Sequence, residues 1–280
     1  MSSVVRALTA GDLEAVAAVG AAAFGFEISS PQAAQRWDAR IAQPFVTDPH
    51  GGFIAERDGR VVGAAQVLVR ERLWVLSLLV VDPHGQSGGA GHQLLAAALR
   101  HGARETDAGL IVSSNDPRAL RLYARSGFEL LPAFEAEGTI DRRALPREAA
   151  GVRAGGDLEA FAGLSREIRG APHTAELRYA VDHGAVLLHL GDRGFAVASE
   201  GHAVWLLVAR DEEAARALLW AALELAGDSE RPLVRWITGD QGWAIDVAVR
   251  AGLGLRAYGA LCVRGRPGPL APFIPSAPFA

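Results

Sequence analysis

The stretch from Val80 to Leu95 reads V-V-D-P-H-G-Q-S-G-G-A-G-H-Q-L-L. A β-branched run ends at Asp82-Pro83, three glycines fall within four positions, and a run of Leu and Ala follows. This order predicts a strand, a tight turn and a helix. A glycine-rich turn before a helix offers free backbone N–H groups beside the positive end of the helix dipole. The stretch therefore predicts a site for a phosphate or a pyrophosphate.

Three kinds of phosphate-binding loop are candidates for this stretch. A Walker loop requires a Lys, and the chain contains none. A dinucleotide-binding loop requires a third Gly at the position of Leu94. The segment Gln86-Ser87-Gly88-Gly89-Ala90-Gly91 fits instead the pattern Q/R-x-x-G-x-G/A after a strand that ends in Val-x-Pro. The loop alone leaves one alternative open, which is a flexible turn before a purely structural helix.

A second motif follows downstream, where residues 115–128 read N-D-P-R-A-L-R-L-Y-A-R-S-G-F. Together the two motifs resemble those of the GNAT superfamily of N-acetyltransferases, in which the glycine loop binds the pyrophosphate of acetyl-CoA. The resemblance covers about residues 75–130, and residues 4–24 match the family's first strand and helix only loosely. Two motifs in the expected order are more specific than either motif alone.

An internal repeat indicates two halves of one fold. Residues 94–99 resemble 218–223, an offset of 218 − 94 = 124, and residues 119–128 resemble 244–253, an offset of 244 − 119 = 125. With the resemblance, this predicts an α/β protein of the α+β type with two tandem GNAT-like domains. Each domain is expected to hold a mixed, mostly antiparallel sheet flanked by helices. The expected domains are a catalytic, acetyl-CoA-binding domain at 1–145, a degenerate domain at 150–266 and an extended Pro-rich tail at 267–280.

The periodicity of the first half predicts its elements. Strands are expected at 4–8, 52–56, 61–70, 73–81 and 110–113 and from 128 onward, and helices at 12–24, 31–41, 89–104 and 117–126. The segment R57-D-G-R60 predicts a tight hairpin turn.

Composition limits the classes of protein that fit. The chain has 280 residues and a net charge of −4, so no basic surface argues for nucleic acid. Cys262 is the sole cysteine and no apolar run is long enough to span a membrane, so we expect a cytoplasmic protein, monomeric or homodimeric. The histidines do not cluster with other ligands, so no metal site is predicted.

The resemblance implies transfer of an acetyl group from acetyl-CoA to a primary amine, by direct attack in a ternary complex. By its position in the motif, Tyr123 is expected to be the general acid, with a role in the helix core as the alternative. The residues expected to bind acetyl-CoA lie on the strand, the glycine loop and the late motif; they are Leu79, Val80, Val81, Gln86, Ser87, Gly88, Gly89, Ala90, Gly91, His92, Asn115 and Arg118.

The general base and the acceptor stay open at this stage. Glu27 and Ser77 are the candidates for contact with the acceptor or with an ordered water, while Glu56 and Glu71 read as charges at strand ends. We expect a small-molecule amine as the acceptor. The alternatives are an amine of a protein or peptide, a non-catalytic acyl-CoA sensor, and a scaffold whose loop binds nothing.

The second half lacks the residues that carry this chemistry. With the two offsets, the glycine loop aligns with the segment R210-D-E-E-A-A215, and Tyr123 aligns with Ala248. Three carboxylates would repel a pyrophosphate, so we predict that the second half binds no acetyl-CoA and helps to wall the acceptor pocket. The tail is expected to run extended over the protein.

Overall fold

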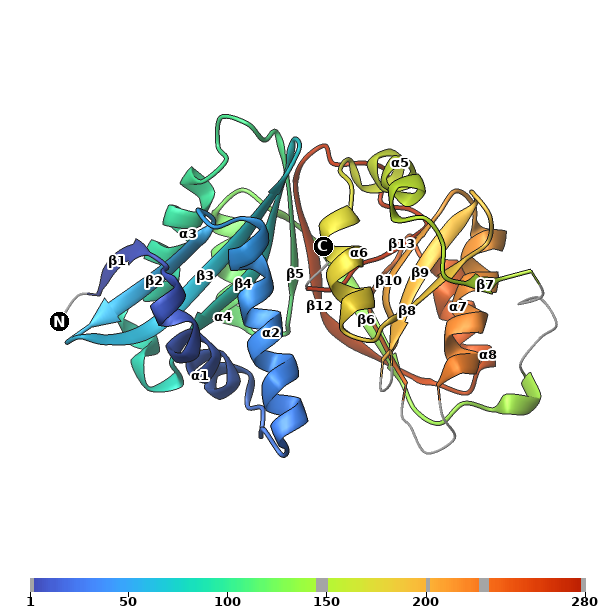
Figure 1. The fold of residues 1–280 in the computed structure, drawn as a ribbon, viewed down its shortest axis with the longest axis horizontal. Helices are drawn as coiled ribbons and strands as arrows, with labels where there is room; N and C mark the ends of the chain where they lie inside the picture. The colour runs from blue at the N-terminus through green and yellow to red at the C-terminus, as the bar shows by residue number, and fades with distance from the viewer. Residues whose placement is uncertain (1–2, 145–150, 200–201, 227–231, 278–280) are drawn as a thin grey trace. The chain divides into compact units, whose positions relative to one another are not determined.

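The computed structural model describes residues 3–144, 151–199, 202–226 and 232–277 (Figure 1). The chain forms two compact units, Met1–Asp107 and Ala108–Ala280. The predicted boundary between the domains stays a prediction, and residues 145–150 at that boundary lie outside the described residues. Among the described helices, none is both long and apolar enough to cross a bilayer.

The first unit is a four-stranded antiparallel meander with helices. Its elements are β1 (Val4–Ala7), α1 (Leu13–Phe24), α2 (Pro31–Thr47), β2 (Gly52–Arg57), β3 (Arg60–Arg70), β4 (Leu73–Val81) and α3 (Ala90–Arg100). The strands pair in the order β1-β2-β3-β4, and every pair is antiparallel. The turn between β2 and β3 places Asp58 and Gly59 at positive φ, as the predicted tight hairpin requires.

Helices cover both faces of this meander. Val16 and Ala17 of α1 belong to one buried cluster with Ala64 of β3, whereas a β-carbon on the adjacent Gly63 would lie 3.0 Å from the Leu94 side chain of α3. Successive strand residues point to opposite faces, so α1 and α3 lie on opposite sides of the sheet. The strand before the glycine loop is therefore buried on both faces.

Two helix ends differ from the sequence prediction. The helix expected at 89–104 ends at Arg100, because Gly102 turns the chain at φ +72. The helix expected at 31–41 continues to Thr47 through Pro44, and it ends where Asp48 donates its backbone N–H to the Pro44 carbonyl oxygen. The predicted ends were wrong because hydrophobic periodicity does not mark where a helix stops.

The second unit carries the rest of the chain. Its first part holds β5 (Ala108–Ser113), α4 (Pro117–Arg125) and β6 (Glu129–Glu137). Then follow β7 (Arg153–Ala154), α5 (Leu158–Arg169), α6 (Thr174–Asp182), β8 (Val186–His189), β9 (Gly194–Ser199), β10 (His202–Ala209), α7 (Glu212–Leu225), β11 (Leu233–Thr238), α8 (Gly242–Arg250), β12 (Gly254–Gly265) and β13 (Phe273–Ile274).

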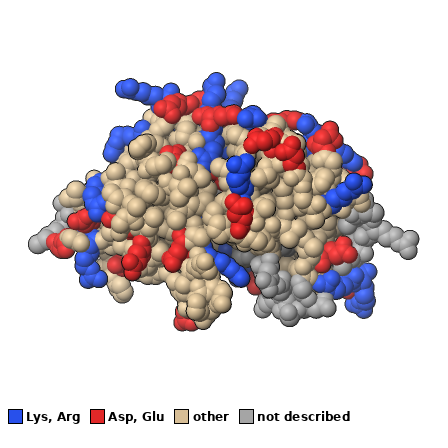
Figure 2. Space-filling view, in the orientation of Figure 1, with Lys and Arg blue, Asp and Glu red and all other residues tan. Residues whose placement is uncertain are grey.

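Figure 2 shows acidic and basic side chains intermingled on the visible face, and the basic ones are all Arg.

The last long strand of the chain completes a sheet begun in the first half of the sequence. Strand β12 pairs with β5 on one side and with β6 on the other, and β6 pairs in turn with β11. The order β5-β12-β6-β11 thus alternates strands from the two sequence repeats (Figure 1). Strands of both repeats therefore lie in one sheet, and each strand in this order is paired with a strand from the other repeat.

A buried carboxylate holds this shared sheet in register. Glu135 of β6 has a fully buried side chain that accepts a hydrogen bond from Arg235 of β11 over 2.8 Å and another from Arg256 of β12. Breaking one partner of a buried ion pair is strongly destabilising, so the pair of arginines fixes β6 between its two neighbours.

The tail lies on the second unit as an edge strand. Gly268 and Leu270 donate their backbone N–H groups to carbonyl oxygens of α5, and β13 pairs antiparallel with β10. Phe273 and Ile274 are fully buried there. The described part of the tail, 267–277, thus runs along α5 and β10, and the tail as a separate segment of the chain stays a prediction.

Candidate active site

The glycine loop leads into a helix whose first backbone N–H groups are capped by none of the described side chains. The loop forms a short 3-10 turn, Pro83–Gly88, and Gly89 follows at φ +74 as the residue before α3. A left-handed φ favours glycine at position 89. Because none of the described side chains caps α3, its first-turn amides and the positive end of its dipole are available to an anion.

An arginine that the sequence analysis did not single out lies against this loop. Arg57 ends β2, and a β-carbon at position 88 would lie 2.2 Å from its Nη2 atom. A β-carbon on Gly85 would lie 3.8 Å from Nη1. Glycine at position 88 therefore leaves the space in which the guanidinium sits. The side chains of Gln86 and Ser87 are outside the described structure.

The strand before the loop carries a bulge at Ser77. Gln66 pairs with Leu78 and Val67 with Leu76, so Ser77 has no opposite residue on β3. Nη2 of Arg40, from α2, donates to the Ser77 carbonyl oxygen over 2.7 Å and lies 3.0 Å from the hydroxyl. Ser77 is buried, and Arg40 hydrogen-bonds it. β-Bulges re-aim a strand and recur next to active sites.

Val80 is buried against α1, and its predicted contacts with acetyl-CoA, like those of Leu79 and Val81, stay a prediction. His92 is exposed in the first turn of α3. Glu27 is exposed in the connection between α1 and α2, where Phe26 and Ile28 are exposed beside it.

The late motif begins with an asparagine that is bound to β12. Oδ1 of Asn115 accepts the backbone N–H of Gly259, and its Nδ2 lies 3.5 Å from the carbonyl oxygen of Ala257. Both contacts are made at the bulge of β12 between Ala257 and Ala260. The side chain expected to bind the pantetheine arm thus supports a strand from the other sequence repeat.

Arg118 forms a two-pronged ion pair with Asp116, the residue that caps α4. Its Nη2 lies 2.7 Å from Oδ2, and its Nε lies 3.0 Å from Oδ1. The guanidinium holds the pKa of Asp116 below its usual range. Because Arg118 is 61% exposed, this pair leaves it accessible to a second anion.

Tyr123 lies on the buried face of α4, beside Cys262 of β12. Its side chain is 5% exposed and makes no hydrogen bond among the described residues. Burial, and secondarily the nearby Cys262 and Asp116, raises the pKa of the phenol well above its usual value. The group therefore stays protonated at neutral pH and has a free O–H to donate.

At residues 210–215, the corresponding place in the second repeat, a side chain caps the helix. Only Arg210 and Asp211 connect β10 to α7, and the Asp211 carboxylate accepts the backbone N–H of Ala214 over 2.9 Å. Arg193 pairs with both Asp211 and Glu213. A carboxylate thus already occupies the helix end, and β13 covers the edge of β10.

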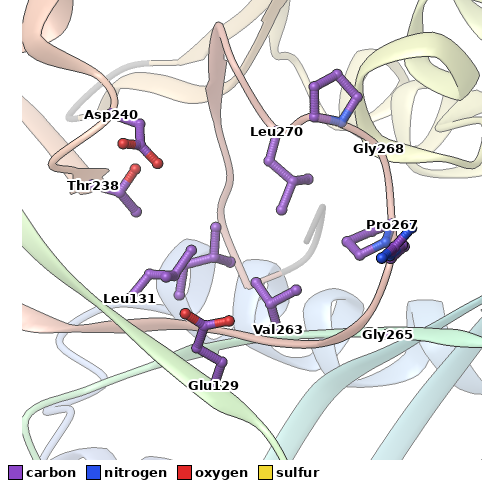
Figure 3. A pocket seen from close by; sticks show the side chains of 12 residues that line it. Glu129, Leu131, Thr238, Asp240, Val263, Gly265, Pro267, Gly268 and Leu270 are labelled. Atoms are coloured by element: carbon purple, nitrogen blue, oxygen red, sulfur yellow. The ribbon is translucent and has the colours of Figure 1, made fainter.

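A cavity of about 370 Å³ lies on the shared sheet within the second unit (Figure 3). Leu131 and Val263 form an apolar floor, and the tail residues from Pro267 to Leu270 close one side. The polar side chains at its lining are Glu129, Thr238, Asp240 and Arg266. The lining thus carries two carboxylates against one guanidinium, and its charge is negative on balance.

Comparison with known proteins agrees with these features. Residues 12–139 match the family model described as an acetyltransferase (GNAT) domain. Curated relatives include the mycothiol acetyltransferases of Streptomyces coelicolor, 39% identical over 116 residues, and Streptomyces avermitilis, 37% identical over 130 residues. The matches cover 40% and 44% of this chain and span only 37% and 42% of those relatives.

Solved structures show the fold over the whole chain. A Pyrococcus horikoshii protein described as an acetyltransferase superposes with a TM-score of 0.83 at 17% identity, over 100% of this chain and 96% of its own. A tandem GNAT protein from the clavulanic acid biosynthesis pathway superposes with a TM-score of 0.62 at 14% identity, over 94% of this chain and 98% of its own. Residues 12–139 thus match a GNAT acetyltransferase domain, and the chain has the fold of tandem GNAT proteins.

Proposed function

We propose that this chain is an N-acetyltransferase that moves the acetyl group of acetyl-CoA onto a primary amine of a small molecule. The observation that carries the proposal is the uncapped amino end of α3 behind Gly89, inside the GNAT domain. The curated relatives, named as mycothiol acetyltransferases, support acetyl transfer to a small-molecule acceptor. The second repeat is proposed to bind no acetyl-CoA, because Asp211 already caps the corresponding helix.

In this proposal the two substrates bind together and react directly. The first-turn amides of α3 bind the diphosphate, and β4 near the Ser77 bulge aligns the thioester. The amine nitrogen forms a bond to the acetyl carbon as the carbon–sulfur bond breaks. The attacking nitrogen gives one proton to a carboxylate or an ordered water, the departing thiolate receives one from the phenol of Tyr123, and solvent then reprotonates that phenolate. The buried, neutral state of Tyr123 supports that role.

The cavity of the second unit supports a small acceptor. Its volume of about 370 Å³ falls within the usual range of small-molecule sites, roughly 300–1,000 Å³. Glu129 and Asp240 would attract an amine that is cationic before it reacts, and neutralising these carboxylates should then raise KM for a cationic acceptor more than it changes kcat.

The test is a turnover assay with acetyl-CoA and a panel of primary amines. The measured signal is the release of the free CoA thiol. The panel includes polyamines, amino sugars, amino-acid amides and a peptide with a free amino terminus. Thiol release that depends on a small amine supports the proposal, and release with the peptide alone contradicts the small-molecule acceptor. Tight binding of acetyl-CoA with no turnover on any amine would favour the acyl-CoA sensor, and no binding at all would leave only a scaffold.

A further inference from the structure

Two nitrogen atoms of the Arg57 guanidinium group lack hydrogen-bond partners among the described residues. These atoms, Nε and Nη2, are both buried. An unsatisfied buried polar group destabilises a fold, and it does so more when it is charged. Such a group in a native fold calls for an explanation, and a bound ligand is one.

Neither Glu56, which precedes Arg57, nor Asp82, which precedes the glycine loop, is hydrogen-bonded to Arg57, and Asp58 is exposed in the hairpin turn. Glu56 accepts a hydrogen bond from Nε of Arg6 over 3.1 Å, and Asp82 accepts the backbone N–H of His84 over 2.9 Å. The guanidinium points instead at the glycine loop, where a β-carbon on Gly88 would lie 2.2 Å from Nη2. A flexible side chain at that position is therefore held against the segment where the anion is expected.

The charge balance of the loop also requires a cation. The end of a helix supplies only about half an elementary charge, whereas a diphosphate carries more than one negative charge. The loop has no Lys, because the chain has none. A guanidinium donates several N–H groups in a fixed plane that matches phosphate oxygens.

On these grounds we infer that Arg57 is a binding residue for the diphosphate of the acyl-CoA, reaching the loop through the space that Gly88 leaves. The inference rests on the proposed function, since it names a contact of the same substrate. Nothing in the glycine-loop motif includes this residue, which lies about 30 positions upstream on the β2–β3 hairpin.

The test compares Arg57→Gln with Arg60→Gln in the full-length protein. Arg60 is the cross-strand neighbour of Arg57, is exposed, and carries the same charge, so it is a matched control. Calorimetry would measure the affinity of each variant for acetyl-CoA and for S-acetylpantetheine, which lacks the diphosphate. Arg57→Gln is expected to weaken acetyl-CoA binding by about tenfold or more and to leave S-acetylpantetheine binding unchanged. Arg60→Gln should stay within about twofold of the parent protein for both.

Two further readouts separate binding from a structural role. Without ligand, Arg57→Gln should melt at the same temperature as the parent protein or higher, because it removes two buried nitrogen atoms that have no hydrogen-bond partner among the described residues. Arg57→Lys, which keeps the charge, should recover part of the lost affinity. The inference is overturned if Arg57→Gln binds acetyl-CoA as the parent does, or loses affinity for both ligands equally. If the parent protein itself binds no acetyl-CoA, the proposed function fails first.

Discussion

The indole N–H of Trp236 donates to the backbone carbonyl oxygen of Ser113 over 3.0 Å. Trp236 lies in β11 and Ser113 ends β5, so the bond joins corresponding strands of the two sequence repeats, just before the late motif. Trp236 is buried and has φ +55, a left-handed conformation that is costly for a bulky residue. The fold maintains that strain at the place where β11 bulges against β6.

Replacement of Trp236 by Phe should therefore lower the free energy of unfolding by about 1–3 kcal/mol, because Ser113 loses a buried donor. Urea denaturation would measure the change. Tyr258→Phe is the comparison, because Tyr258 keeps its ring beside Trp236 and Arg235 and should be neutral. Equal stability of Trp236→Phe and the parent would mean that this bond contributes nothing.

Tyr123→Phe should lower turnover by roughly 100-fold or more, the usual scale of general acid catalysis, and leave the affinity for acetyl-CoA unchanged. Stability should not fall, because the phenol O–H has no hydrogen-bond partner among the described residues. Steady-state kinetics and calorimetry on the same preparation would check both parts. Unchanged turnover would remove Tyr123 from the mechanism and leave it as a core residue.

Calorimetry on the full chain should find one acetyl-CoA per chain. Asp211→Ala removes the cap of α7 and should cost about 1 kcal/mol of stability, without adding a second binding event. Asp157→Ala, which uncaps α5 in the same way, is the matched control for stability. A second equivalent of bound acetyl-CoA in either protein would contradict the prediction for the second repeat.

Asp12 should make stability depend on pH in the acidic range. Its carboxylate accepts hydrogen bonds from Arg6 at 2.8 and 2.9 Å and from the backbone N–H of Thr9, and mainly the bonds with Arg6 hold its pKa well below the usual value. Because the pKa of this carboxyl is lower in the folded than in the unfolded state, its ionised form stabilises the fold. This contribution is fully present at a pH above the unfolded-state pKa, roughly 4, and it is lost as the pH falls below that value. The stability gap between the parent and Asp12→Asn should thus be largest near neutrality and shrink below about pH 4. Unfolding measured from pH 7 to pH 3 would show this, and a gap that grows in acid would refute it.

Phe273→Ala should destabilise the second unit by about 3–5 kcal/mol, because the ring is 1% exposed on β13. Phe26→Ala removes a ring that is 54% exposed and should cost much less. Thermal unfolding of both variants would compare them. Similar losses would mean that the tail's packing contributes little to stability.

The sequence predicted much of the first unit, because its strands and hairpin are encoded by local periodicity and turn residues. The hairpin at Asp58 and Gly59 and the strand 73–81 are confirmed. Arg57 and Arg40 were not found, because their contacts depend on distant chain segments and no local pattern marks them. The roles of Tyr123 and of the loop residues stay predictions.

The sequence could not reveal which strands become neighbours. The repeat showed that 244–253 corresponds to 119–128, and this correspondence holds for α8 and α4. It contained no sign that β12 would lie between β5 and β6, because pairing across 100 or more residues leaves no periodic trace. Asn115 shows the same limit, since its motif position predicted a substrate contact and its side chain also binds Gly259.

The position of β12 imposes an order on biosynthesis. Strand β6 ends at Glu137 and β12 begins at Gly254, a separation of 254 − 137 = 117 residues. At roughly 5–20 residues per second, a ribosome needs roughly 6–23 seconds to cover that distance. During this interval the edges of β5 and β6 that will flank β12 have no strand between them. The nascent chain must keep those edges from pairing with other polypeptides until its own carboxyl-terminal segment emerges.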